Sequence, residues 1–216
     1  MRRRTLFGGL ACLPVVASAQ PVLGSPDLSR YAAGRLPPEW LTSMRTGSGA
    51  PGSWSVVEDH SARGGKAIEQ SNPDATDYRF PLAVFQPLLA TDVDASVRFR
   101  AVSGKGDRAG GLVVRLLDAD NYYVVRANAL EDNVNLYRVV KGRRQEIKGA
   151  STSVTAGEWH LLSLRAQGPS LSVSFDGRPL LTADDRTILG PGRVALWTKA
   201  DSVTRFDNLK IVSLLI

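Results

Sequence analysis

The chain has 216 residues, a formal net charge of +6 and one cysteine, Cys12. Three positive charges come from Arg2, Arg3 and Arg4, and the other charges of both signs are interspersed, which argues against a nucleic-acid-binding protein. One cysteine excludes an internal disulfide, and no apolar run after the N-terminus is long enough to span a bilayer.

The N-terminus has the pattern of an export signal. Basic residues precede a short apolar run from Leu6 to Val16, and Ala17-Ser18-Ala19 offers a small-residue cleavage site. We therefore predict a signal peptide over residues 1–19 and a periplasmic or secreted protein. The pair Arg3-Arg4 leaves both the general secretory and the twin-arginine routes open, and lipidation at Cys12 is a further alternative.

Residues 20–50 are polar and contain proline and glycine, which predicts a flexible leader. The folded domain is predicted over residues 51–216. In it, apolar and polar residues alternate, turns contain Gly, Pro or Asp, and no helical period is seen, so the fold class is all-β with two antiparallel sheets. The expected strands are 54–58, 67–70, 82–85, 93–100, 110–117, 122–128, 134–140, 143–147, 159–165, 171–175, 178–182, 193–198 and 205–213.

The clearest alternation lies near the end of the chain. Leu171, Val173 and Phe175 alternate with Ser172 and Ser174, as in a half-buried antiparallel strand. The following pair, Asp176-Gly177, tolerates positive φ and predicts a tight hairpin turn.

Several motifs together resemble a known fold family. Gly157-Glu158-Trp159-His160, Phe175-Asp176-Gly177, the segment 192–197 and the segment 206–211 resemble the concanavalin A-like, laminin-G-like jelly roll. The segment 111–128 is similar to exported bacterial domains of the 3-keto-disaccharide hydrolase type, which are related to glycoside hydrolase family 16. This resemblance implies a jelly-roll sandwich with one curved sheet, whose concave face or rim loops commonly hold sugars. Because the fold hosts lectins, glucanases and adhesion modules, it does not settle the activity.

Alternation along four strands predicts which side chains would face such a ligand. A sugar needs flat aromatic surface and planar hydrogen-bonding groups, and the residues expected to point outward supply both. They are Arg115, Arg126, Asn128, Asn135, Tyr137, Trp197 and Lys199. Two alternatives remain, an ordinary solvated face and a Trp197 that packs in the core.

Catalytic residues cannot be assigned from the sequence. The Glu-x-Asp-x-x-Glu strand of the related β-glucanases is absent, and pairs such as Asp118 and Asp120 fall in turns. His60 and His160 lack the spacing of zinc sites. We predict no cofactor and keep a structural calcium ion as an alternative. Jelly rolls of this type often place a carboxylate in the last strand, here Asp207, but the favoured interpretation is that loop amides satisfy this carboxylate.

The sequence favours an exported, non-catalytic carbohydrate-binding domain with an oligo- or polysaccharide as its partner, and we expect a monomer. A glycoside-acting hydrolase of the 3-keto-disaccharide type is one alternative, and a structural or adhesion module is another. On the favoured hypothesis Trp197 would be exposed, so that its loss would abolish sugar binding with little effect on stability.

Overall fold

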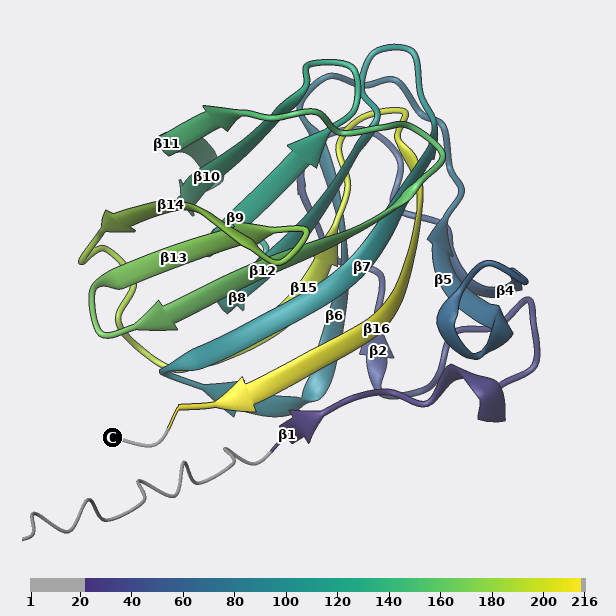
Figure 1. Ribbon diagram of the computed structural model, residues 1–216, viewed down its shortest axis with the longest axis horizontal. Coiled ribbons are helices and arrows are strands. Elements are labelled where there is room, and N and C mark those ends of the chain that lie inside the picture. Colours follow the sequence, from purple (N-terminus) through teal and green to yellow (C-terminus); the bar gives the residue numbers. More distant parts are fainter. Residues whose placement is uncertain (1–21, 215–216) are drawn as a thin grey trace, which may run out of the picture.

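The computed structural model describes residues 22–214, which form two antiparallel sheets packed face to face (Figure 1). In sheet A the strands follow the order β14-β13-β12-β7-β16-β5-β4, with β1 beside β16. In sheet B the order is β11-β10-β9-β8-β15-β6-β2, with β3 beside β6. The predicted all-β, concanavalin A-like jelly roll is therefore confirmed.

Each predicted strand overlaps an observed strand from β4 to β16, and several observed strands, such as β6, are longer than predicted. Sheet A contains β1 (Val22–Gly24), β4 (Trp54–Glu58), β5 (Lys66–Gln70), β7 (Val93–Ser103), β12 (Trp159–Gln167), β13 (Ser170–Phe175), β14 (Arg178–Asp184) and β16 (Val203–Ser213). Sheet B contains β2 (Trp40–Leu41), β3 (Arg45–Gly47), β6 (Arg79–Ala90), β8 (Ala109–Asp118), β9 (Asn121–Asn128), β10 (Asn133–Val140), β11 (Arg143–Ser151) and β15 (Gly192–Trp197). The described residues also include two short 3-10 helices, η1 (Leu28–Arg30) and η2 (Arg63–Gly65). The predicted signal peptide lies outside the described residues.

The segment predicted as a flexible leader contributes to both sheets. β1 pairs with β16, and β2 and β3 pair with β6. Trp40 is 7% exposed and Thr46 is fully buried. From Val22 onward this segment is thus part of the domain. Strands of two or three residues are too short to show alternation, which is why the sequence did not reveal them.

The main core lies between the two sheets. Alternate residues of sheet A, such as Val97, Leu162 and Leu171, pack against those of sheet B, such as Leu112 and Val125. Burying each such side chain stabilises the fold by about 1.5–3 kcal/mol. The hairpin between β13 and β14 turns at Asp176 and Gly177, with φ of 49° and 76°, as the Asp-Gly pair predicted.

A second apolar cluster lies on the face of sheet B that points away from sheet A. Alternation in the sequence predicted that this face binds the ligand. It is formed mainly by large buried side chains from β6, β8, β9, β10 and β15. Its members are Phe80, Leu82, Val84, Ala109, Val113, Leu116, Tyr122, Val124, Tyr137, Val139, Ala195 and Trp197.

Hydrogen bonds between segments on this face of sheet B cover the second cluster. The Thr46 hydroxyl of β3 donates to the carbonyl of Ala119 in the β8–β9 turn at 2.5 Å, and lies 2.7 Å from the Tyr122 hydroxyl. The Tyr78 hydroxyl donates to the carbonyl of Gly142 in the β10–β11 turn at 3.0 Å. The β8–β9 and β10–β11 turns are thus bonded to β3 and to the residue before β6. The cluster on this face is therefore buried.

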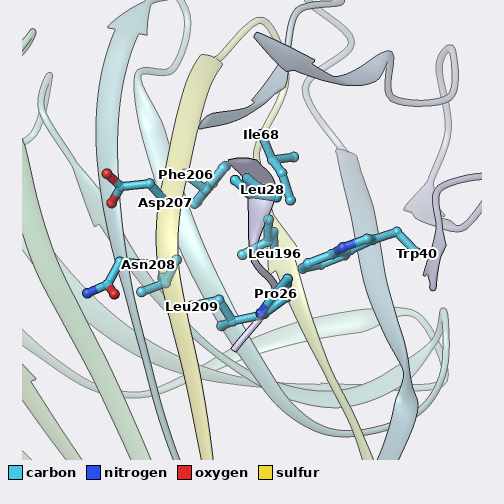
Figure 2. Close-up of a pocket in the computed structure, with 10 residues that line it drawn as sticks. Pro26, Leu28, Trp40, Ile68, Leu196, Phe206, Asp207, Asn208 and Leu209 are labelled. Atoms are coloured by element: carbon cyan, nitrogen blue, oxygen red, sulfur yellow. The ribbon is translucent and has the colours of Figure 1, made fainter. Parts of the chain in front are cut away.

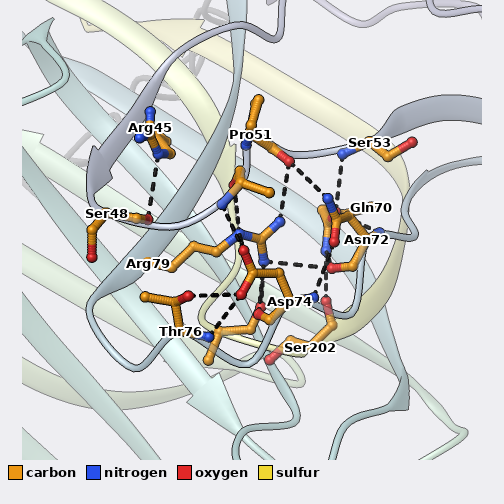
Figure 3. Close-up of polar contacts among 12 residues, drawn as sticks. Arg45, Ser48, Pro51, Ser53, Gln70, Asn72, Asp74, Thr76, Arg79 and Ser202 are labelled. Carbon is orange, nitrogen blue, oxygen red and sulfur yellow. Dashed lines mark hydrogen bonds and ion pairs between the residues drawn. The ribbon is translucent and has the colours of Figure 1, made fainter.

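Arg79 fastens the loops beside β6 to the sheets (Figure 3). Its guanidinium is fully buried and donates to the carbonyls of Ala50, Pro51, Asn72, Asp74 and Ala200. One side chain therefore joins segments that lie far apart in the sequence.

Asp74 completes this cluster and gives it a pH dependence. Its carboxylate accepts hydrogen bonds from the Ala50 amide at 2.6 Å and from the Thr76 amide and hydroxyl at 2.9 and 2.7 Å. These bonds, the Ala50 amide first, lower the pKa of Asp74 from 3.8 to about 2.

We expect Asp74 to contribute stability that is lost in acid. The unfolded chain takes up this proton first, so the contribution is present above about pH 4 and disappears as the pH falls toward about 2. Denaturation of Asp74→Asn should show lower stability than wild type at neutral pH, and the difference should shrink below pH 4. Glu158→Gln, at an exposed position, is the control. A difference that is independent of pH would contradict this assignment.

Candidate functional site

Trp197, Arg126, Asn135 and Tyr137 of the predicted ligand residues share a face of sheet B. Directly opposed positions on five neighbouring strands are held by Leu82, Trp197, Gly111, Arg126 and Asn135. Tyr137 lies beside this row, with its ring centre 5.7 Å from the Arg126 guanidinium carbon. The predicted arrangement of Arg126 and Trp197 on one face is thus found, and ligand binding by them stays a prediction.

This face does not offer the expected stacking surface, because the aromatic rings are covered. Trp197 is fully buried and Tyr137 is 6% exposed. The Trp197 ring stacks on Phe80 at 5.1 Å between ring centres, and its Nε1 donates to the Tyr122 hydroxyl at 3.3 Å. The guanidinium of Arg144 lies 4.5 Å from the Tyr137 ring centre and 5.9 Å from that of Trp197. The alternative that Trp197 packs in a core is therefore correct.

The polar members of the predicted set bond with one another and with nearby acids. Arg126 Nη2 donates to Glu131 at 2.6 Å, and Asn128 Nδ2 donates to Asp107 at 2.9 Å. Lys199 lies 2.6 Å from the Asp107 carboxylate, and Asn135 Nδ2 donates to the Tyr137 hydroxyl at 3.0 Å. Burial raises the pKa of Asp107, and the Lys199 ammonium opposes this shift. The polar members are therefore engaged within the protein, with Glu131 and Asn135 nearest the solvent.

Arg115 points elsewhere, and its predicted outward orientation is wrong. The backbone has φ of 50° at this residue, and the pairing of β8 with both neighbouring strands is irregular there. The bulge breaks the alternation that the prediction assumed. The buried side chain donates to the carbonyls of Thr91, Gly168 and Ile188, and it pairs with Asp92 at 3.0 Å. Arg115 therefore ties turns together and belongs to no ligand face.

The carboxylate of Asp207 is engaged by protein donors through one oxygen, and calcium binding there stays a prediction. Ca²⁺ takes about six to eight oxygen ligands. One oxygen of Asp207 accepts bonds from the Arg63 amide at 2.6 Å and from Arg98 at 3.1 Å. Within residues 22–214 no group of three His, Cys, Asp or Glu side chains is placed to hold a metal. Burial raises the pKa of Asp207, and the Arg63 amide and the Arg98 guanidinium oppose the rise.

The outer face of sheet A, in contrast, is open. Two hollows of about 430 and 390 Å³ lie on it, and they adjoin where Ser163 of β12 faces Ser96 of β7. We call this surface the open face of sheet A. Its lining residues include Asp94, Ser96, Arg98, Trp159, Leu161, Ser163, Arg165, Ser172, Ser174 and Lys210.

Trp159 supplies the aromatic surface of the open face. The half-buried indole lines the smaller hollow, and its Nε1 donates to the Ser61 hydroxyl at 2.9 Å. The guanidinium carbons of Arg98 and Arg100 lie 4.8 and 5.3 Å from the ring centre. Because Arg98 pairs with Asp207 and Arg100 with Asp59, the two guanidinium groups beside the ring are held in place.

A bulge in β16 brings an amide to the same hollow. Between Asp207 and Lys210 the pairing with β7 shifts, and Asn208 adopts φ of 50°. Figure 2 shows Asp207 and Asn208 pointing away from the side chains of Phe206 and Leu209. Asn208 thereby lines the hollow beside Trp159.

The interior space next to this bulge is too small for a ligand. Pro26, Leu28, Trp40, Phe206 and Leu209 are among the residues that line it (Figure 2). Its volume of about 10 Å³ leaves room for one water molecule at most. Ligand binding is therefore better sought on the open face.

Sequence reasoning missed Trp159 as a site residue although the signal was present. Leu162 and Leu164 point into the core, so alternation along β12 places Trp159, Leu161 and Ser163 on the outer face. The bulge that presents Asn208 has no comparable signal in the sequence.

Comparisons with known proteins agree on the fold. Residues 108–214 match a family described as galactocerebrosidase, C-terminal lectin domain. The carbohydrate-binding module CBM66 from Bacillus subtilis is similar, at 23% identity and a TM-score of 0.63, over 81% of this chain and 96% of that one. No curated protein matches the sequence.

Two further solved structures share the architecture at lower identity. The β-glucanase of Bacillus licheniformis has 13% identity and a TM-score of 0.56, over 84% of this chain and 95% of its own. The exoplasmic/lumenal domain of VIP36, in its Ca²⁺/Man-bound form, also has 13% identity and a TM-score of 0.56, over 83% and 84%. Among the described residues, no helix has the length and apolar character needed to cross a membrane.

Proposed function

We propose that this protein is an exported, non-catalytic carbohydrate-binding domain whose ligand lies on the open face of sheet A. The observation that carries the proposal is the grouping of Trp159, Arg98 and Asn208 around one hollow. Sugars are bound by flat aromatic surface together with planar donors and acceptors, and these three side chains supply both. The adjoining serines add hydroxyl groups along the face.

The relatives support a sugar ligand. The matched family is a lectin domain, and one similar structure is a carbohydrate-binding module. Export is supported by the basic residues, apolar run and small-residue site at the N-terminus.

The carboxylates near the open face of sheet A already have partners within the protein, which supports a non-catalytic role. Asp94 lies 3.6 Å from Arg165, and Asp207 pairs with Arg98. Asp176 accepts a hydrogen bond from the Leu161 amide at 2.8 Å and lies 2.8 Å from His160 Nδ1. Glycoside hydrolysis uses two carboxyl groups that flank the scissile bond, and each of these acids is held by another partner.

Replacing Trp159 tests the proposal directly. In affinity electrophoresis and calorimetry with a panel of polysaccharides, Trp159→Ala should weaken binding at least about tenfold, a loss of about 1.4 kcal/mol. Its melting temperature should fall by only a few degrees, because each lost arginine–indole contact contributes about 0.5–1 kcal/mol.

A matched control separates binding from general damage. Leu130→Ala removes an apolar side chain that is 45% exposed in the β9–β10 turn, away from the open face, and should bind like wild type. Unchanged affinity in folded Trp159→Ala would place the ligand elsewhere. A folded wild-type protein that binds no polysaccharide would refute the proposed function itself.

A further inference from the structure

We infer that the ligand of the open face is an anionic polysaccharide, one whose sugars carry carboxylate or sulfate groups. This inference rests on the proposed function and narrows it. Its basis is the unequal charge of the side chains that line the two hollows. Five are cationic and two are acidic: Arg63, Arg98, Lys148, Arg165 and Lys210 against Asp94 and Asp176.

Several of these charges already have partners. Arg165 lies 3.6 Å from Asp94, and Arg98 lies 3.1 Å from Asp207. Lys148 Nζ donates to the carbonyl of Thr182 at 3.0 Å. Arg165 and Arg98 therefore have acidic partners within the protein, and Lys148 has a carbonyl acceptor.

Arg63 and Lys210 differ from the other three cations. Both are exposed, and within residues 22–214 neither lies within salt-bridge distance of a carboxylate. Both line the hollow that contains Trp159 and Asn208. The cations available to an external anion are thus next to the proposed aromatic contact.

The local backbone fixes where these two cations emerge. The Arg63 amide is bonded to Asp207 at 2.6 Å, and Lys210 follows the bulge on β16, opposite Ser96 of β7. A polymer whose sugar ring rests near Trp159 could place an anionic group between Arg63 and Lys210. Its hydroxyl groups would then meet Asn208 and Ser96. A neutral polymer would gain the aromatic and amide contacts without the two ionic ones.

Binding to matched acidic and neutral polymers tests this inference. We expect the wild type to bind polygalacturonate, or a sulfated polymer such as carrageenan, at least about fivefold more tightly than dextran and carboxyl-reduced polygalacturonate. Comparison of the carboxylated with the sulfated polymer identifies the anionic group. The preference should weaken between about 0.1 M and about 1 M salt, where the Debye length falls from about 10 to about 3 Å.

Two double variants test whether the preference for anionic polymers depends on Arg63 and Lys210. Arg63→Gln with Lys210→Met should lose at least about fivefold in affinity for the anionic polymer and little for neutral ones. Lys141→Met with Arg143→Gln makes the same change of charge at two exposed positions, in the β10–β11 turn and at the start of β11, and should bind like wild type. Equal losses in both double variants would show a nonspecific charge effect and overturn the inference.

The two levels of proposal fail in different ways. Binding of neutral polymers alone, unchanged in the Arg63/Lys210 variant and abolished in Trp159→Ala, would overturn the anionic ligand and leave carbohydrate binding intact. A folded protein that binds neither class of polymer would overturn both.

Discussion

Replacing Trp197 with alanine is expected to lower the free energy of unfolding by roughly 3–5 kcal/mol, because it empties a large site in a closed interior. The ring is fully buried, stacks on Phe80 and lies against Gly111, where an added Cβ would come within 2.9 Å of it. Its indole nitrogen also donates to the buried Tyr122 hydroxyl. Guanidinium denaturation should measure the loss, and the melting temperature should fall by roughly 6–20 °C.

A conservative variant separates this structural role from ligand binding. Trp197→Phe keeps much of the packing, so it should fold and bind polysaccharides with wild-type affinity. A loss of binding in Trp197→Phe with unchanged stability would restore the predicted sugar site on sheet B. An unfolding free energy of Trp197→Ala within about 1 kcal/mol of wild type would show that the face is open.

The second large effect is expected for Arg79→Met, at roughly 3–5 kcal/mol of lost stability. This change removes a fully buried guanidinium that donates to five carbonyl groups. The carbonyls of Pro51 and Asn72 keep a second donor, and those of Ala50, Asp74 and Ala200 lose this one. Each buried acceptor left without a partner costs about 1–3 kcal/mol, and rearrangement of the loops relieves part of the total.

Hydrogen exchange should locate this effect. Amides of residues 50–53 and 70–76 should exchange faster in Arg79→Met, because the guanidinium holds these loops to β6 and to Ala200. Arg143→Met, at an exposed position, is the control and should change stability by less than about 0.5 kcal/mol. A similarly small change in Arg79→Met would contradict the bonding in Figure 3.

The sequence by itself determined the strands and the sandwich. The period of two in segments such as Leu171–Phe175 assigns each side chain to one side of a sheet, and the Asp176-Gly177 pair fixes a turn. The same alternation correctly put Arg126 and Trp197 on one face. These features depend on neighbouring residues, so local sequence carries them.

Only the tertiary structure decided what lies beyond each face. Alternation of apolar and polar residues predicts which side of a sheet a side chain occupies. It does not predict whether other segments cover that side. Trp197 is buried because contacts from Thr46 and Tyr78, far away in the sequence, close its face, and Trp159 stays at the surface because nothing described closes the face of sheet A. The bulges at Arg115 and Asn208 likewise depend on pairing between distant strands, which the order of residues within one strand does not express.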